Sequence, residues 1–420
     1  MTDRDYRSRV VDEELARRLE TSGAVLIEGP KACGKTETAR QKAAGEVLLD
    51  VDEGARAAAS VDPSLLLDGE APRLLDEWQL EPRLWDHVRR AVDERDAPGQ
   101  FILAGSAVPA DDSSRHSGAG RVSRLRMRPM SLFESGLSDG AISLAEAMDG
   151  GNVESADRGV RLPDLTEAIV RGGWPALQAV PIEAAGAAVA DYLEEVSRTD
   201  INQVDGVRRD PVRVRRLIAS LGRNVATYAS MATLAADSAA GGEDRLKDET
   251  VAAYLAALER LFVIEDQPPW EPHLRSRSRL RRTPKRHFVD PSLAAAALGA
   301  EPAALLRDLR LLGFLFESLV VRDLRVYSQM GRGEVRQFRD NKGLEVDAVL
   351  ARPDRWGAFE IKLGGEQAID EAARSLLKFA GEIDTGRSGA PGVLGVIVAG
   401  GYGYVREDGV RVIPITSLGP

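Results

Sequence analysis

The residues best suited to chemistry in this chain of 420 residues form one short stretch with the Walker A pattern, Gly-x4-Gly-Lys-Thr. In such a loop the glycines let backbone N–H groups converge on a triphosphate, Lys35 can reach the β- and γ-phosphates, and the Thr36 hydroxyl can ligate Mg²⁺. The predicted nucleotide-binding residues are Gly29, Pro30, Lys31, Ala32, Cys33, Gly34, Lys35, Thr36 and Glu37. We therefore expect the chain to bind ATP or GTP together with Mg²⁺.

The segments on either side favour this interpretation over a simple glycine-rich turn. The apolar run from Ala24 to Ile27 predicts a strand, and the stretch from Thr38 to Ala44 predicts a helix. A helix that begins at the loop directs its positive end at the bound anion. Cys33 is the only cysteine, which excludes a disulfide or a cysteine-ligated zinc site within one chain and fits a reducing cytoplasm.

A pair of acids further along the chain supplies what such a loop needs for hydrolysis. The segment from Arg73 to Gln79 reads as a short apolar strand that ends in Asp76 and Glu77. Asp76 would hold Mg²⁺ through water, and Glu77 would polarise the attacking water. The alternative is a strand that runs into a solvated turn. The chain between the loop and Asp76 has room for another strand and helix, however, as a parallel α/β sheet requires.

The order of these motifs resembles that of a known group, the prokaryotic AAA-type ATPases that carry a C-terminal domain of unknown function related to PD-(D/E)XK nucleases. The resemblance covers nearly the whole chain and implies an N-terminal P-loop AAA-type parallel sheet. It is carried by Gly-x4-Gly-Lys-Thr, then Pro72-Arg-Leu-Leu-Asp-Glu-Trp-Gln79, Leu103-Ala-Gly-Ser106, Gly120-Arg121 and Met127-Arg-Pro-Met-Ser-Leu132.

The resemblance implies two further residues at the nucleotide. Ser106 ends a third predicted strand, Phe101 to Ser106, and would sense the γ-phosphate from between the metal strand and the phosphate strand. Arg121 would contact a γ-phosphate in its own subunit or in a neighbour's, in which case a homo-oligomer completes the site. The alternatives are a strand-ending turn at Ser106 and an exposed strand face around Arg121, because Arg124, Arg126 and Arg128 alternate at the strand period.

A second group of acids, with a lysine, lies in a small α/β module predicted near the C-terminus. Glu360 and Lys362 are two apart on a strand and so face the same way, and an antiparallel hairpin puts Asp347 opposite Glu360 to within one residue. The predicted elements are helix 305–327, strands 334–339, 345–350 and 358–363, helix 366–380 and strand 392–398.

This second group could form a metal site. Asp347 and Glu360 could hold Mg²⁺ by hard oxygen ligands, Lys362 could position or activate a water, and Glu317 on the preceding helix would be the outer acid. The order resembles the PD-(D/E)XK nuclease core, with valine in place of the proline before Asp347. The alternative is an exposed, salt-bridged strand face, and a nuclease-like fold does not establish cleavage.

The middle of the chain is predicted to be helical and to contain a winged helix. Helices are expected over 165–170, 182–198, 211–224, 230–236 and 248–261, and strands near 262–264 and 287–289 would form the wing. The segment between these strands is basic and would meet the phosphates of DNA or RNA. It contains Arg275, Arg277, Arg279, Arg281, Arg282, Lys285 and Arg286. The alternatives are a solvated loop or a docking surface for an acidic partner.

Length, charge and hydropathy limit the class of protein, its location and its number of domains. The net charge of −10 argues against a chain that coats nucleic acid along its whole surface. No apolar run approaches the ~18 to 20 residues that span a bilayer, and the N-terminus lacks a signal peptide, so we expect a cytoplasmic protein. The predicted domains are a P-loop AAA-type domain (1–150), a helical lid or linker (151–210), a winged-helix-like domain (211–300) and a PD-(D/E)XK nuclease-like α/β module (301–420).

Two functions are compatible with these features. The first is an ATPase that couples hydrolysis to action on nucleic acid through a C-terminal metal-dependent nuclease. The second is a non-nucleolytic switch, in which the nucleotide controls binding to a protein partner or to operator DNA in a defence, toxin–antitoxin or regulatory role.

Overall fold

The computed structural model describes residues 6–106, 118–239, 245–272 and 283–420. The chain forms two compact units, and each of them is built from more than one segment. Unit 1 comprises Met1–Pro129, Arg198–Arg209 and Ala256–Val263. Unit 2 comprises Met130–Ser197, Asp210–Leu255 and Ile264–Pro420.

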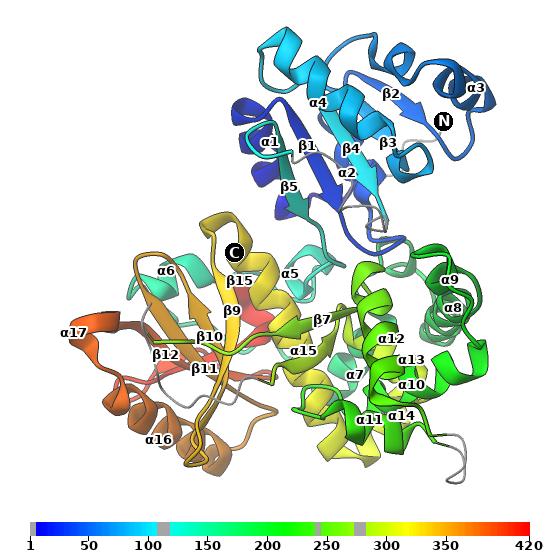
Figure 1. Cartoon of the computed structure of the whole chain (residues 1–420). Coiled ribbons are helices and arrows are strands. Elements are labelled where there is room, and N and C mark those ends of the chain that lie inside the picture. The colour runs from blue at the N-terminus through cyan, green and yellow to red at the C-terminus, as the bar shows by residue number, and fades with distance from the viewer. Residues whose placement is uncertain (1–5, 107–117, 240–244, 273–282) are drawn as a thin grey trace. The chain divides into compact units, whose positions relative to one another are not determined.

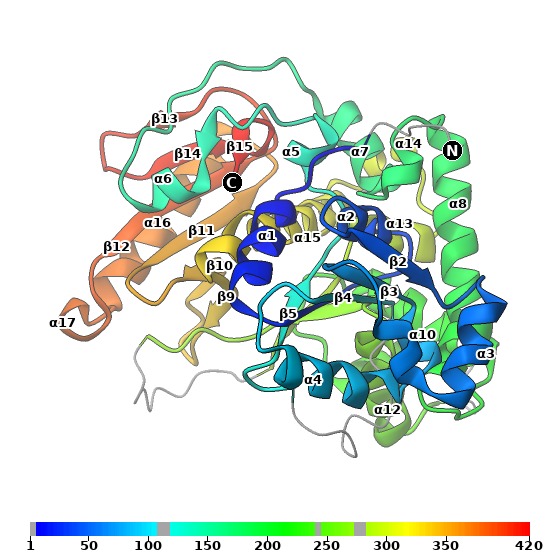
Figure 2. The ribbon, with the colours of Figure 1, turned by 90° about the horizontal axis from the view of Figure 1, so that it is seen from above.

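Unit 1 is a parallel α/β domain, and its N-terminal segment is drawn in blue to cyan in Figure 1 and seen from above in Figure 2. Its strands run in the order β2-β3-β4-β1-β5, and each neighbouring pair is parallel. The strands are β1 (Ala24–Glu28), β2 (Gly45–Leu48), β3 (Arg73–Asp76), β4 (Phe101–Gly105) and β5 (Val122–Arg126). The helices are α1 (Val11–Thr21), α2 (Lys35–Arg40), α3 (Glu53–Val61), α4 (Leu84–Arg95) and the short α9 (Ile201–Gln203).

The predicted strands at the nucleotide motifs are confirmed, and their parallel pairing brings those motifs together. Since parallel strands share one carboxyl edge, the loop after β1, the acids after β3 and Ser106 after β4 all lie at the same edge of the sheet. The helix α2 ends at Arg40 rather than at Ala44. The reason is that the Ala44 N–H already donates to the carbonyl of Pro72, 2.8 Å away, where the chain enters the sheet as β2.

The first part of unit 2 consists of helices and a two-stranded antiparallel ribbon of β7 and β8, drawn in green in Figure 1. The predicted helices of the middle region are all present, and Gly172 ends α7 with a φ of 69°. The elements are α7 (Leu162–Arg171), α8 (Ile182–Glu195), α10 (Pro211–Arg223), α11 (Met231–Asp237), α12 (Asp248–Arg260), β7 (Ile264–Gln267), β8 (Lys285–Phe288), α13 (Pro291–Ala297) and α14 (Pro302–Arg307). The last residues of α12, from Ala256, belong to unit 1.

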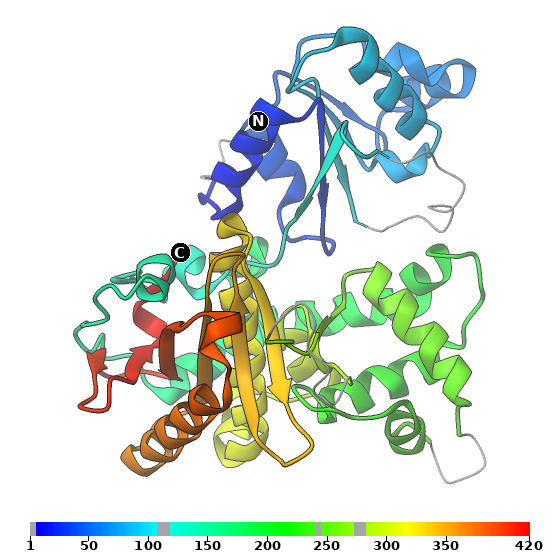
Figure 3. The ribbon, with the colours of Figure 1, turned by 60° about the vertical axis from the view of Figure 1, so that its left-hand side comes forward.

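The rest of unit 2 is the α/β module predicted near the C-terminus (Figure 3). Its sheet has the order β13-β14-β12-β11-β10-β9, antiparallel among β9, β10 and β11 and parallel where β12 joins β11 and β14. The elements are α15 (Leu309–Ser328), β9 (Glu334–Arg339), β10 (Glu345–Ala351), β11 (Trp356–Lys362), α16 (Glu366–Glu382), α17 (Thr385–Ser388), β12 (Pro391–Val398), β13 (Tyr404–Val405) and β14 (Arg411–Pro414).

The first domain ends earlier than the predicted boundary at residue 150. The segment after Met130 forms α5 (Leu132–Ser135), β6 (Ile142–Ser143) and α6 (Leu144–Met148), and β6 pairs in parallel with β15 (Leu418–Gly419) at the end of the chain. This segment is therefore part of unit 2.

In the part of the chain that the structure describes, no helix is long and apolar enough to cross a membrane.

Aromatic side chains form the centre of the core between α16 and the C-terminal sheet. The Phe379 ring lies 4.7 Å from that of Phe338, 5.7 Å from that of Trp356 and 6.0 Å from that of Trp270, measured between centroids. Phe379 has no exposed surface. Close-packed aromatic contacts of this kind cannot be replaced by a smaller side chain without leaving a cavity.

We predict that Phe379→Ala lowers the free energy of unfolding of unit 2 by about 3 to 5 kcal/mol, because it removes buried apolar surface and leaves a cavity. The matched control is Leu377→Ala on the same helix, where the side chain is 39% exposed. Leu377→Ala should lower the free energy of unfolding by about 1 kcal/mol or less. Urea unfolding followed by tryptophan fluorescence measures both, and equal losses would show that the aromatic cluster is not a core.

Candidate functional site

The phosphate loop between β1 and α2 has the backbone shape of an anion cradle. Ala32 and Gly34 both adopt left-handed conformations, with φ of 61° and 103°. A Cβ atom at Gly29 would lie 2.1 Å from the carbonyl oxygen of Met127, so only glycine fits there. Left-handed residues in a loop of this kind are typical of backbones whose N–H groups bind an anion.

Lys35 is held inside its own loop. Its Nζ donates to the carbonyl oxygens of Gly29, at 3.0 Å, and Pro30, at 2.8 Å, and its side chain is buried. An ammonium group that is already positioned in the loop can exchange these carbonyl acceptors for the oxygens of a triphosphate, which carry full negative charge. The prediction that Lys35 contacts a nucleotide is compatible with this position.

Thr36 and Asp76 meet at the carboxyl edge of the sheet. The Thr36 hydroxyl donates to the Asp76 carboxylate, with Oγ1 2.9 Å from Oδ2 and 3.2 Å from Oδ1. Burial raises the pKa of Asp76 to about 6, and the Thr36 hydrogen bond opposes that shift. A hydroxyl and a carboxylate are hard oxygen donors of the kind Mg²⁺ prefers, so this pair fits the predicted ion.

Glu77 and Ser106 also lie together. The Ser106 hydroxyl is 3.3 Å from Oε2 of Glu77, which also accepts a hydrogen bond from the Gln79 amide. Glu77 has a φ of 51°, a conformation that non-glycine residues seldom adopt and that recurs at functional sites. β4 lies between β3 and β1, so Ser106 follows the strand between the one that ends in Asp76 and the one that precedes the phosphate loop.

Residues that the motifs did not indicate support the loop. The buried Arg9 guanidinium donates to the carbonyl of Cys33 and to that of Arg128, each at 2.8 Å. Lys31 forms an ion pair with the buried Asp200 at 2.6 Å. Arg9 and Asp200 are far from the loop in sequence and belong to no pattern, so nothing in the sequence pointed to either of them.

The prediction that Arg121 contacts the γ-phosphate of its own subunit is wrong. β5 is parallel to β1, and the carbonyl of Arg121 accepts from the N–H of Ala24 at the amino end of β1. The loop leaves the other end of that strand, about 16 Å away at the usual rise per residue. Arg121 instead forms an ion pair with Asp93 at 2.6 Å. Of the arginines in the alternative interpretation, Arg124 and Arg126 lie on β5 and only Arg124 is exposed, whereas Arg121 and Arg128 lie outside the strand.

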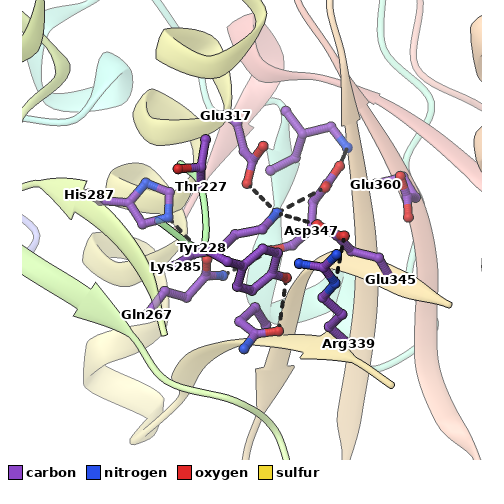
Figure 4. A network of polar contacts seen from close by, with 12 residues as sticks. Thr227, Tyr228, Gln267, Lys285, His287, Glu317, Arg339, Glu345, Asp347 and Glu360 are labelled. Atoms are coloured by element: carbon purple, nitrogen blue, oxygen red, sulfur yellow. Dashed lines mark hydrogen bonds and ion pairs between the residues drawn. The ribbon is translucent and has the colours of Figure 1, made fainter. Parts of the chain in front are cut away.

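The C-terminal acids converge as the hairpin predicted (Figure 4). Ala348 pairs with Phe359, so Asp347 stands opposite Glu360 in the antiparallel ladder. The Lys362 Nζ lies 2.7 Å from Glu360 Oε2 and 3.2 Å from Asp347 Oδ2. The N–H of Ile361 donates to the same Asp347 oxygen at 2.9 Å.

A lysine from the ribbon enters this cluster. Lys285 on β8 is 2% exposed, and its Nζ lies 2.8 Å from Glu317 Oε1, 3.2 Å from Glu345 Oε1 and 3.3 Å from Asp347 Oδ1. The prediction that Lys285 faces nucleic acid in a wing is therefore wrong, because its charge is used within the protein. Its neighbour Arg286 is also engaged, and donates to the carbonyl of Ala229 at 2.7 Å.

The remaining arginines of the predicted basic segment lie outside the described residues. They are Arg275, Arg277, Arg279, Arg281 and Arg282.

The metal site expected at Glu317, Asp347 and Glu360 does not fit this arrangement. Among residues 6–106, 118–239, 245–272 and 283–420, no three His, Cys, Asp or Glu side chains are grouped so that they could hold a metal ion. The physical reason is that an ammonium group already stands between the carboxylates of Glu317 and Asp347.

Burial and the two lysines set the charges in this cluster. Burial raises the pKa of Glu317 to about 7 and that of Glu360 to about 8. Burial also opposes ionisation of Asp347, but Lys285 and Lys362 outweigh it and hold the pKa of that carboxyl well below its usual range. Burial favours the neutral amine of Lys285, yet Glu317 and Asp347 outweigh it and raise its pKa well above the ordinary value. Lys285 is thus a cation.

Comparison with known proteins supports part of this picture. Residues 21–135 match the family described as AAA domain, so this segment is similar to AAA-type ATPase domains. Residues 162–304 and 312–418 match two families, DUF8612 and DUF4143, that are both described as domains of unknown function.

Two relatives extend over most of the chain. An uncharacterized protein of Mycobacterium bovis and one of Mycobacterium tuberculosis are each 26% identical over 409 residues, which is 96% of this chain and 82% of the relative. Among solved structures, a Walker-type ATPase of Pyrococcus abyssi is 14% identical and covers 70% of this chain and 97% of its own, with a TM-score of 0.44.

We predict that Arg9→Ala weakens nucleotide binding about tenfold, because it removes a charge-assisted hydrogen bond that fixes the Cys33 carbonyl in the phosphate loop. Arg7→Ala is the matched control, since Arg7 is exposed two residues away. Titration with a fluorescent ATP analogue measures both affinities. Unchanged binding in Arg9→Ala, with the fold intact, would mean that the loop holds its shape without this residue.

Proposed function

We propose that this protein is a Mg²⁺-dependent ATPase whose nucleotide state controls the rest of the chain without cleavage of nucleic acid. The observation that carries the hydrolysis half is the contact of Thr36 with Asp76 beside a formed phosphate loop, with Glu77 and Ser106 at the same edge of the sheet. The match of residues 21–135 to the AAA family supports it.

Each side chain has a separate role in this proposal. Lys35 leaves the carbonyls of Gly29 and Pro30 and binds the terminal phosphates. The Thr36 hydroxyl and the Asp76 carboxylate would hold Mg²⁺, which when bound neutralises charge that develops on the phosphate oxygens. Glu77 accepts a hydrogen bond from the attacking water and orients it, and Ser106 positions the Glu77 carboxylate.

The helices α10 to α12 and the ribbon β7–β8 are the proposed output. The order of helices followed by an antiparallel ribbon is compatible with a winged helix, a module that binds either DNA or proteins. The charged groups of Lys285 and Arg286 are bound to other groups of the protein. This favours a protein partner or a switch over a wing that binds phosphates at these two positions. An oligomer in which a neighbour supplies an arginine to the nucleotide remains part of the proposal.

We predict that Glu77→Gln lowers the rate of ATP hydrolysis about 100-fold or more, because the amide cannot accept a proton, while ATP affinity stays close to that of the wild type. Lys35→Ala should lose affinity as well, about tenfold or more, since it removes a charged contact to phosphate. Glu70→Gln, at an exposed acid of the same domain, is the control and should change neither value. Phosphate release and nucleotide titration give the two readouts.

The switch is tested separately with the same variant. Glu77→Gln with ATP should stay in the nucleotide-bound state, so its oligomeric mass or its affinity for duplex DNA should differ from that of the nucleotide-free protein. Analytical ultracentrifugation and fluorescence anisotropy measure these. If hydrolysis is present but ATP changes neither quantity, the protein is an ATPase without this kind of switch.

A further inference from the structure

The buried lysine of the ribbon is surrounded by carboxylates that come from two other elements of unit 2 (Figure 4). Glu317 comes from α15, and Glu345 and Asp347 come from β10. An ammonium group has three N–H donors, and here three carboxylate oxygens lie 2.8 to 3.3 Å from Nζ. Nζ donates hydrogen bonds to Glu317 and Asp347 and forms a further ion pair with Glu345, so the buried charge is paired with carboxylates.

The neighbouring residues fix Lys285 in this position. Gln267 pairs with Lys285 across the ribbon and donates to the backbone carbonyls of Asp347, at 2.9 Å, and Arg336, at 3.1 Å. The ring of Tyr228 lies 5.4 Å from Nζ and covers the ammonium group, and the Tyr228 hydroxyl is bound to Gln337. The ribbon is thus tied to β9 and β10 at the same point at which its lysine enters the cluster.

Both oxygens of Asp347 already accept hydrogen bonds from groups of the chain. Oδ1 is bound to Lys285, and Oδ2 is bound to Lys362 and to the N–H of Ile361. A divalent cation bound by Glu317 and Asp347 would stand next to the Lys285 ammonium and be repelled by it. Occupation by metal and occupation by Lys285 therefore exclude each other.

We propose that Lys285 replaces the divalent cation in the nuclease-like centre of this chain, so that the carboxylates fasten the ribbon to the C-terminal sheet and do not bind metal. The centre acts as an internal ionic lock. This inference does not depend on the nucleotide site.

Manganese binding tests the proposal directly, because Mn²⁺ takes carboxylate ligands readily and is counted by electron paramagnetic resonance. The nucleotide-free wild type should show no Mn²⁺ binding that depends on Asp347. Lys285→Met keeps the apolar stem and removes the charge, and it should gain one site at least about tenfold tighter than any in the wild type. The site should be lost again in Lys285→Met with Asp347→Asn.

Lys378→Met is the matched control, since Lys378 is exposed on α16, and it should gain no site. Asp347-dependent Mn²⁺ binding in the wild type would overturn the proposal, and so would a folded Lys285→Met protein without a new site.

A second measurement uses the wild type alone and covers the case in which Lys285→Met does not fold. Acylation of lysines, located by mass spectrometry, should leave Lys285 unmodified both without and with saturating Mn²⁺, while Lys378 reacts in both. Modification of Lys285 that appears only with Mn²⁺ would show that metal displaces the lysine, which contradicts the lock.

Discussion

The parallel pairing of β1, β3 and β4 is the constraint on which the nucleotide site depends. It brings the carboxyl ends of three strands to one edge, and each strand ends in a residue with its own chemistry: the phosphate loop, the Asp76–Glu77 pair and Ser106. The same constraint places the start of β5 at the opposite edge, which is why Arg121 cannot reach a phosphate held by its own loop. The parallel pairing thus brings Asp76 and Ser106 to the nucleotide site and keeps Arg121 away from it.

The buried charged side chains of the two units have different kinds of binding partner. In unit 1, Lys35 and Asp76 are held by polar groups that a nucleotide and its ion could replace, two backbone carbonyls in one case and a hydroxyl in the other. In unit 2, the carboxylates of Glu317 and Asp347 are bound to an ammonium group of the chain itself. A site whose partners are neutral can accept a charged ligand. In the proposed lock of unit 2, the charges are instead paired within the fold.

Local patterns predicted the parts of the fold that depend on local residues. The strand before the phosphate loop, the acids that end β3 and the register that sets Asp347 opposite Glu360 all follow from short segments, and the structure contains them. The register of the hairpin of β10 and β11 was predicted to within one residue, because the turn fixes the register of an antiparallel pair. The place of Lys285 could not be predicted in this way, since its partners are far away in sequence and only the packing of β8 brings them together. For the same reason, local patterns predict a first domain that ends at residue 150. In the structure, β6 pairs with the distant β15, and residues 142–143 belong to unit 2.

The central claim is that the loop from Gly29 to Thr36 binds and hydrolyses ATP. The most direct measurement is a crystal structure with Mg²⁺ and a non-hydrolysable ATP analogue. The account predicts that Lys35 leaves the carbonyls of Gly29 and Pro30 for the terminal phosphates, with the ion beside Thr36 and Asp76 and with Glu77 facing the γ-phosphate. A nucleotide bound elsewhere, or a Lys35 that keeps its carbonyl partners beside a bound triphosphate, would contradict it.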